Sequence, residues 1–147
     1  MAVRRRQRRL RAIGPHELNE AQLLRLGRKP LAMFCDEASH ALCFPEDQFR
    51  TLVDQGTVVR AEEIYRNKHS GLITRCVFFA RPAETWRIAP AKHIQRAMFC
   101  GDRAGCTADD VALGRLLGYG ANAVRSFVRR TRKARAKKPH LRKLSYR

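Results

Sequence analysis

Hydrophobic and polar positions along the chain recur with two different periods, which separate expected strands from expected helices. Residues 57–66 and 72–80 are rich in β-branched and aromatic side chains, and a Gly-, Asn- and Ser-containing connection joins them. Both are therefore predicted to be antiparallel strands. A third strand is expected over residues 85–89, after the connection "RPAE". Residues 31–44 are predicted to form two further short strands around the polar "DEAS" turn, with a helix as the alternative.

Apolar residues at helical spacing indicate five helices in the rest of the chain. One begins near Pro45, where two acidic residues favour the helix start, and ends at Gly56. Thr107 is the expected N-cap of another. The helices are predicted over residues 15–26, 45–56, 90–101, 106–118 and 121–138.

This order predicts a mixed α/β fold of the α+β type, in which a small antiparallel sheet with flanking helices precedes a C-terminal three-helix unit. A chain of 147 residues is long enough for one domain with appended arms. The expected division is a basic arm, an α/β core domain, a helical unit and a basic tail, over residues 1–14, 15–89, 90–138 and 139–147.

Charge is distributed unevenly along the sequence. The chain carries 31 Lys and Arg against 13 Asp and Glu, a net charge of +18. Residues 1–30 hold nine cations and two acids, residues 31–110 hold ten and eleven, and residues 111–147 hold twelve and none. An ordinary solvated surface mixes both signs, so the cationic ends predict a polyanionic partner, with nucleic acid ahead of an anionic membrane surface. No apolar run approaches the roughly 20 residues that span a bilayer, so no membrane partner is expected.

The stretch "DVALGRLLGYGANAVRSFVR", residues 110–129, resembles the helix-turn-helix motif of bacterial and phage DNA-binding proteins. In that motif a small residue lies where the two helices touch and a glycine provides the positive φ of the turn, and Gly114 and Gly118 occupy these places. The sequence departs from the motif at Asp110, where a glutamine often contacts phosphate, and at Gly120, where a Ser or Thr cap is usual. The apolar places of the motif hold Leu113, Leu117, Tyr119, Val124 and Phe127, which are expected to close a small core.

The resemblance implies that the helix starting at Ala121 lies in the major groove of DNA. Asn122 suits bidentate contact with adenine and Arg125 suits guanine, and Ser126 and Arg129 belong to the same expected surface. Cations further along the helix would follow the phosphates: Arg130, Arg132, Lys133 and Arg135. The alternative is a helical hairpin that packs the domain and has a solvated basic end.

The first fourteen residues are predicted to form a phosphate-binding arm. Six arginines crowd this segment without acidic partners: Arg4, Arg5, Arg6, Arg8, Arg9 and Arg11. The segment also resembles the arginine-rich peptides that grip RNA hairpins, so specific RNA recognition is an alternative to a DNA arm. It lacks the apolar stretch of a secretory signal, and an organellar transit peptide is a further alternative.

Cysteine usage indicates a reducing compartment. Five cysteines, an odd number, without a secretory signal predict free thiols in the cytoplasm. Cys35, His40 and Cys43, together with Cys100 and Cys106, are the candidates for a zinc site. Neither cysteine spacing is the tight one of structural zinc sites, so no metal or other cofactor is expected.

Catalytic chemistry is weakly indicated. Glu62, Glu63 and His69 flank a predicted hairpin and are candidates for a metal-dependent nuclease, although charges on the exposed face of a strand are the simpler explanation. No phosphate-cradling glycine loop and no nucleophile elbow is present.

The sequence as a whole predicts a non-enzymatic DNA-binding regulator or accessory factor of bacterial or phage type. It is expected in the cytoplasm, and on the nucleoid in a bacterium. Residues 31–90 are expected to serve a homodimer or a protein partner. The alternatives are an RNA- or ribonucleoprotein-binding protein that uses its basic ends, and an inhibitor that acts through protein–protein interaction.

Overall fold

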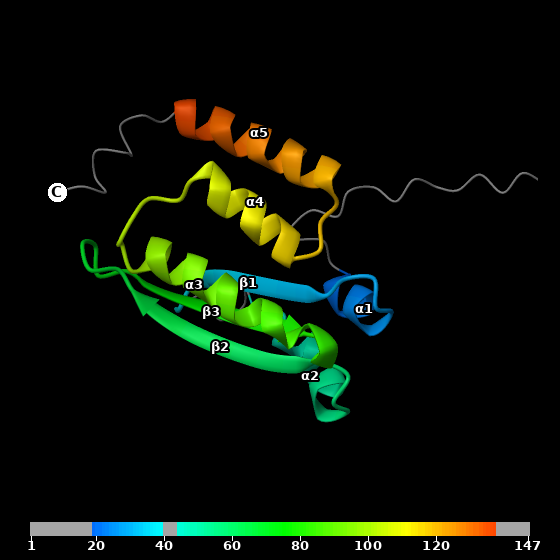
Figure 1. The fold of residues 1–147 in the computed structure, drawn as a ribbon. Coiled ribbons are helices and arrows are strands. Elements are labelled where there is room, and N and C mark those ends of the chain that lie inside the picture. Colours follow the sequence, from blue (N-terminus) through cyan, green and yellow to red (C-terminus); the bar gives the residue numbers. More distant parts are fainter. Residues whose placement is uncertain (1–18, 40–43, 138–147) are drawn as a thin grey trace, which may run out of the picture.

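The computed structural model describes residues 19–39 and 44–137 (Figure 1). A three-stranded antiparallel sheet packs with helices, which confirms the expected α+β class. The described elements are α1 (Glu20–Arg25), β1 (Leu31–Glu37), α2 (Glu46–Asp54), β2 (Val59–Arg66), β3 (Ile73–Ala80), the 3₁₀ helix η2 (Pro82–Arg87), α3 (Ile88–Phe99), α4 (Thr107–Leu116) and α5 (Ala121–Lys137). The expected basic arm and tail lie outside the described residues.

The sheet has the strand order β1-β3-β2, so β3 is the central strand. Successive side chains of a strand point to opposite faces, and β3 is buried on both faces from Cys76 to Ala80. The apolar run "CVFFA" reflects this double burial, because both neighbours of β3 and the helices above and below cover it.

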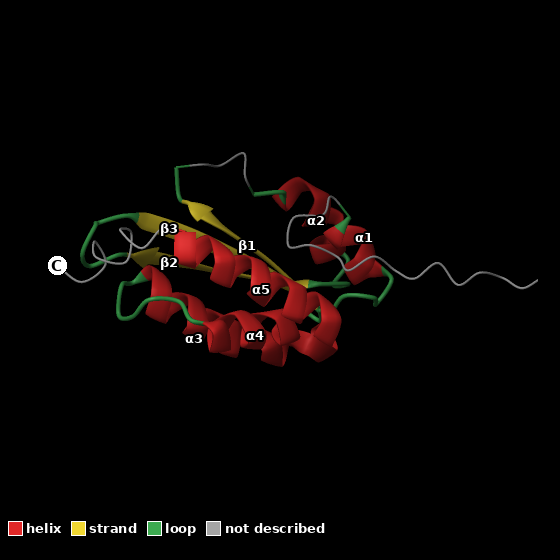
Figure 2. Ribbon diagram, turned by 90° about the horizontal axis from the view of Figure 1, so that it is seen from above, coloured by secondary structure: helices red, strands yellow, loops and turns green. Residues whose placement is uncertain are grey.

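Two hydrophobic clusters lie on the two faces of the sheet. On one face α1 and α2 cover Phe79, whose ring stacks on that of Phe49 with centroids 3.9 Å apart. On the other face α3 and α4 cover Phe78, and Leu117 belongs to the same cluster as Leu31 of β1. Figures 1 and 2 show α3, α4 and α5 gathered on this second side of the sheet. Residues before and after position 90 therefore share one core.

The predicted strand over residues 85–89 is wrong. Residues Pro82–Arg87 form η2, and α3 begins directly after it at Ile88. Pro82 at the start of η2 and the ion pair of Arg87 with Glu84, at i,i+3 spacing and 2.6 Å, favour a tight helical turn over an extended strand.

The third strand comes instead from residues 31–44. Its first half, β1, is confirmed, but it pairs antiparallel with β3 rather than with a neighbour beyond the "DEAS" turn. Phe44 lies outside any strand, and residues 40–43 fall outside the described range. The last four predicted helices are confirmed with small shifts, and the N-cap of α4 is Cys106 rather than Thr107. The first is confirmed over Glu20–Arg25, and its predicted start at residues 15–18 lies outside the described residues.

The expectation that the cysteines are free thiols is corrected at one pair. Cys35 of β1 and Cys76 of β3 are directly opposite in the register, with Cα atoms 4.2 Å apart, and form a disulfide. Because β1 and β3 lie far apart along the chain, the spacing of the cysteines did not indicate that Cys35 and Cys76 would form a disulfide. Cys100 and Cys106 have free thiols.

The turn between α4 and α5 is fixed against the loop between α1 and β1. Gly118 has φ +80°, and a Cβ atom there would lie 2.3 Å from Cδ of Pro30. The ammonium group of Lys29 donates to the Tyr119 hydroxyl at 3.1 Å and to Glu20 at 2.7 Å. These contacts tie the last two helices to the first part of the chain. Among the described helices, none is long and apolar enough to cross a membrane.

The Gly118→Ala substitution is expected to lower the free energy of unfolding by about 2–4 kcal/mol, because it combines a strained φ with a clash against Pro30. The matched control is Gly56→Ala. Gly56 also has a positive φ, but no atom lies within 4 Å of its would-be Cβ, so only the backbone strain of about 1–2 kcal/mol applies. Urea unfolding of both variants measures the difference. Equal losses would contradict the close approach of the turn to Pro30.

Candidate nucleic-acid interface

The helices α4 and α5 form a hairpin on the outside of the molecule. They run side by side in opposite directions, and Figure 1 shows α5 beyond α4 at the top of the molecule. A Cβ atom at Gly114 would lie 2.8 Å from Cγ2 of Val124, so this glycine allows the helices to touch. Gly118 supplies the positive φ of the turn. Both glycines therefore have the local roles expected from the sequence.

The apolar set of residues 110–129 is only partly enclosed. Leu117 and Val124 are buried, whereas Phe127 is 37% exposed. Phe127 lines a cavity of about 240 Å³ together with Met33 and Met98, because α5 does not close fully onto β1 and α3. The expectation that all five apolar residues close a core is thus wrong for Phe127.

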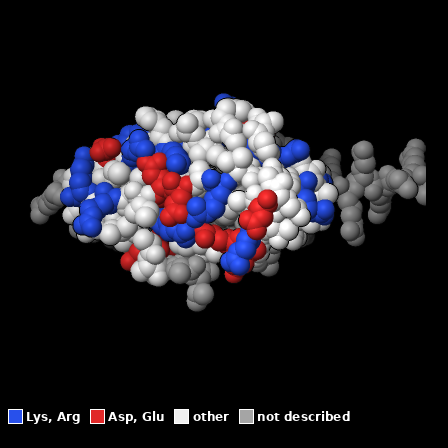
Figure 3. Space-filling view, turned by 90° about the horizontal axis from the view of Figure 1, so that it is seen from below, with Lys and Arg blue, Asp and Glu red and all other residues white. Residues whose placement is uncertain are grey.

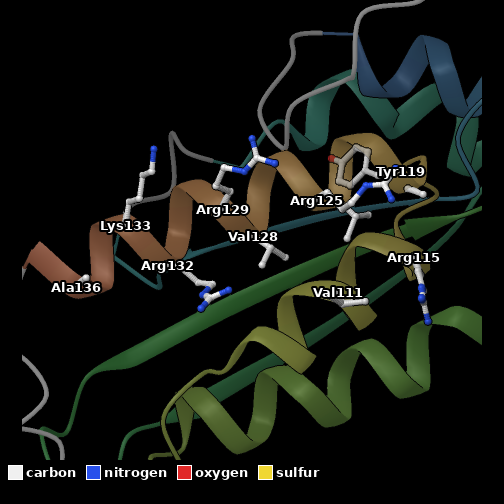
Figure 4. Close-up of a pocket in the computed structure, with 11 residues that line it drawn as sticks. Val111, Arg115, Tyr119, Arg125, Val128, Arg129, Arg132, Lys133 and Ala136 are labelled. Atoms are coloured by element: carbon white, nitrogen blue, oxygen red, sulfur yellow. The ribbon is translucent and has the colours of Figure 1, made fainter.

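A basic groove of about 870 Å³ lies between α4 and α5 (Figure 4). In Figure 4, Val128 and Arg132 point toward α4, and Arg129 and Lys133 lie on the outer side of α5. The floor is formed by small and β-branched side chains from both helices. The cationic lining residues are Arg115, Arg125, Arg129, Arg132 and Lys133, and no acidic residue of the described chain lines the groove.

The sequence-predicted contact residues divide between two sides of α5. Four of the groove cations were among them, since positions 125, 129 and 132 share one face at i,i+4 and i,i+3 spacing. Ser126 and Arg130 line the smaller cavity on the other side. Asn122 is exposed and accepts a hydrogen bond from the guanidinium of Arg125. Arg135 lies in α5, and the description does not extend to its side chain or to the arginines of residues 1–14.

Arg115 is a groove residue that sequence reasoning missed. It is the one cation within α4. It lies four residues before Tyr119, which also lines the groove, and this spacing could have indicated that Arg115 is a groove residue. The carbonyls of Arg115 and Leu116 accept hydrogen bonds from Nη1 of Arg87, at 3.0 and 3.1 Å. The end of α4 is thereby held against η2.

The start of α4 is held by a buried carboxylate. Asp109 receives a bidentate pair of hydrogen bonds from Arg103, and its carboxylate also accepts from the backbone N–H of Cys106 at 3.1 Å. The bond from Arg103 is the main cause that lowers the pKa of Asp109 to about 2. Asp109 also supplies negative charge at the N-terminus of the helix, where the macrodipole favours it.

Cations on the opposite side of the sheet are neutralised. Arg60 and Arg75 both contact Glu46 and Glu62, and hydrogen bonding from Arg75 is the main cause that lowers the pKa of Glu62 to about 2. Figure 3 shows acidic and basic side chains side by side across this face. Arg60 and Arg75 are therefore paired with carboxylates, unlike the cations that line the groove.

The candidate nuclease residues are not brought together. Glu62 and Glu63 are neighbours in β2 and so point to opposite faces, where Glu63 pairs with Arg96. His69 donates from Nε2 to the carbonyl of Gly101 at 2.9 Å. Across residues 19–39 and 44–137, no three His, Cys, Asp or Glu side chains are placed to hold a metal ion. Of the zinc candidates, Cys35 is in the disulfide, and His40 and Cys43 lie outside the described residues.

Asp109→Asn is expected to lower the free energy of unfolding at pH 7 by about 2 kcal/mol, because it removes a charge-assisted pair and a cap. The folded-state pKa is below the ordinary value of 3.8. The stabilisation by Asp109 is therefore complete above about pH 4 and is lost as the pH falls toward about 2. Urea unfolding at a series of pH values should show the gap between wild type and variant narrowing over this range.

The control for that series is Asp47→Asn, which removes an exposed ion pair with Arg50. Exposed pairs of this kind contribute little, so this variant should follow the wild type at every pH. A gap for Asp109→Asn that stays constant down to pH 2 would contradict the role assigned to the Asp109 carboxylate.

Comparison of this chain with protein-family models, with curated proteins and with solved structures gives no match. The function is therefore inferred from the groove. Its lining cations have no acidic residue of the described chain among them, whereas the arginines on the other face of the sheet are ion-paired.

Proposed function

We propose that the protein binds DNA, without catalysing a reaction on it, through the basic groove between α4 and α5 and the exposed face of α5. The observation that carries the proposal is that five cationic side chains line one groove, with no acidic residue in its described lining. The 37 residues from 111 to 147 hold twelve cations and no acid.

Phosphate neutralisation would supply most of the affinity. Each Lys or Arg that contacts a phosphate releases condensed counterions, so binding weakens as the salt concentration rises. Arg129 and Lys133 on the outer side of α5 are accessible to a phosphate backbone without any rearrangement of the helix. Arg115 and Arg132 would extend the contact into the groove.

Base recognition is assigned to the first turns of α5. Asn122 and Arg125 are exposed and hydrogen-bonded to each other, so a base edge would have to compete with or share that bond. Arg125 offers the bidentate donor geometry that matches guanine. In this proposal, Arg125 contributes to sequence preference and Arg129 contributes to affinity for any sequence. A regulator or accessory factor acting in the cytoplasm, with a partner bound through residues 31–90, would fit this division.

Arg129→Ala is expected to weaken binding to every DNA duplex similarly and to lower the salt slope by about 1, since one phosphate contact is lost. Arg125→Ala is expected to cost about 1–3 kcal/mol on a preferred site and much less on other sequences. Fluorescence anisotropy with labelled duplexes from a selected pool, over a salt series, measures both effects.

The matched control is Arg66→Ala, which removes an exposed arginine at the end of β2, on the far side of the sheet from α5 (Figure 1). It changes the net charge by the same amount, so a general charge effect would appear in it equally. If Arg66→Ala and Arg129→Ala weaken binding to the same extent, the groove is not the interface. If double-stranded RNA of matched length binds more tightly than every DNA duplex, the RNA-binding alternative replaces the proposal.

A further inference from the structure

The only tryptophan of the chain lies on the surface. Trp86 belongs to η2 and is 60% exposed. A large aromatic side chain contributes most to stability when it is buried, and an exposed one is typical of a recognition site. The described core does not use Trp86, because neither hydrophobic cluster includes it.

The exposed indole is held in place by its neighbour. The guanidinium of Arg87 lies over the Trp86 ring, 4.6 Å from its centroid. Arg87 is itself fixed, because Nε donates to Glu84 at 2.6 Å and Nη1 donates to the two carbonyls at the end of α4. An aromatic ring backed on one face by an anchored cation presents its other face to solvent without much loss of side-chain entropy.

The same hydrogen bonds connect Trp86 to the basic groove. Arg87 contacts both the Trp86 ring and the backbone of Arg115, and Arg115 lines the groove between α4 and α5. Arg87 therefore joins the Trp86 ring to the wall of the groove that α4 forms. Cations that follow a backbone, next to an aromatic platform, are the arrangement by which proteins hold unpaired nucleic acid.

We propose that Trp86 stacks on an unpaired nucleobase of a strand bound in the groove, so that the protein prefers nucleic acid with single-stranded bases over fully paired duplex. This inference rests on the proposed function, because the groove must bind the phosphates. The bases inside a duplex are already stacked on each other, and only an unpaired base has a free face for the indole. An apolar protein partner is less well matched, because the charged groups of Arg87 and Glu84 lie beside the ring.

The test uses the full chain, whose tryptophan fluorescence comes from Trp86 alone. A mixed-sequence single-stranded DNA, the same sequence as RNA and the blunt DNA duplex are each titrated at equal salt. The single strands are expected to quench the emission strongly and the duplex weakly. Trp86→Ala is expected to lose about 5- to 150-fold in affinity for the single strands, with little change for the duplex, whereas Trp86→Phe retains most of the affinity.

The outcomes separate this inference from the proposed function. If Arg129→Ala weakens binding but Trp86→Ala does not, and single strands leave the emission unchanged, the stacking inference is overturned and the groove stands. If neither variant changes binding, the proposed function fails as well. If a thermal melt shows that Trp86→Ala folds poorly, Trp86→Phe and the quenching of wild-type emission still test the stacking inference. A duplex that quenches the emission as strongly as the single strands would overturn the preference for unpaired bases.

Discussion

The arrangement of the C-terminal helices depends on a buried ion pair in the N-terminal part of the described chain. Lys29 and Glu20 are each only 3% exposed and lie 2.7 Å apart, and the same ammonium group lies 4.8 Å from the centroid of the Tyr119 ring. A charge buried to this degree is tolerated only where its partners are fixed. Lys29 therefore connects α1 to the turn that opens α5. This contact and the approach of Pro30 to Gly118 hold the turn from which α5 starts.

The second constraint is the placement of acidic residues. In α2 and β2, Glu46, Glu62 and Glu63 are each ion-paired with arginine or lysine. Asp109 is ion-paired in the same way at the start of α4. Beyond Asp110 the sequence contains no acid. Arg60 and Arg75 consequently support the fold, whereas no acidic residue lines the groove beside the described arginines of α5.

Sequence patterning predicted the elements that local periodicity defines. The strands over residues 57–66 and 72–80 and the limits of α2, α3, α4 and α5 follow from apolar spacing, acidic first turns and glycine stops. Pairing of β1 with β3, and with it the Cys35–Cys76 bridge, could not be predicted, because register between strands 40 residues apart along the chain has no local signature. The prediction of a strand at 85–89 was wrong because a proline at the start of the segment and an ion pair within it favour a 3₁₀ turn over an edge strand.

The sequence predicted most of the cationic residues of the candidate site but not the groove that they line. The cationic face of α5 was accessible from spacing, and the role of Gly114 where the two helices touch was implied by the resemblance to the helix-turn-helix motif. The groove was not, because its other wall contains Arg115 and Val111 of α4, and which side of α4 faces α5 is decided by tertiary packing. The exposure of Phe127 has the same origin, since it depends on how far α5 stands away from β1 and α3.

The central claim is that nucleic acid contacts the α4–α5 groove, and amide hydrogen exchange with and without bound DNA tests it most directly. The account predicts slower exchange in peptides from α4 and α5 on binding, with peptides from α2 and β2 unchanged. Slower exchange confined to peptides from residues 1–18 and 138–147, with α4 and α5 exchanging as in the free protein, would show that the basic ends bind alone and would contradict the assignment of the groove.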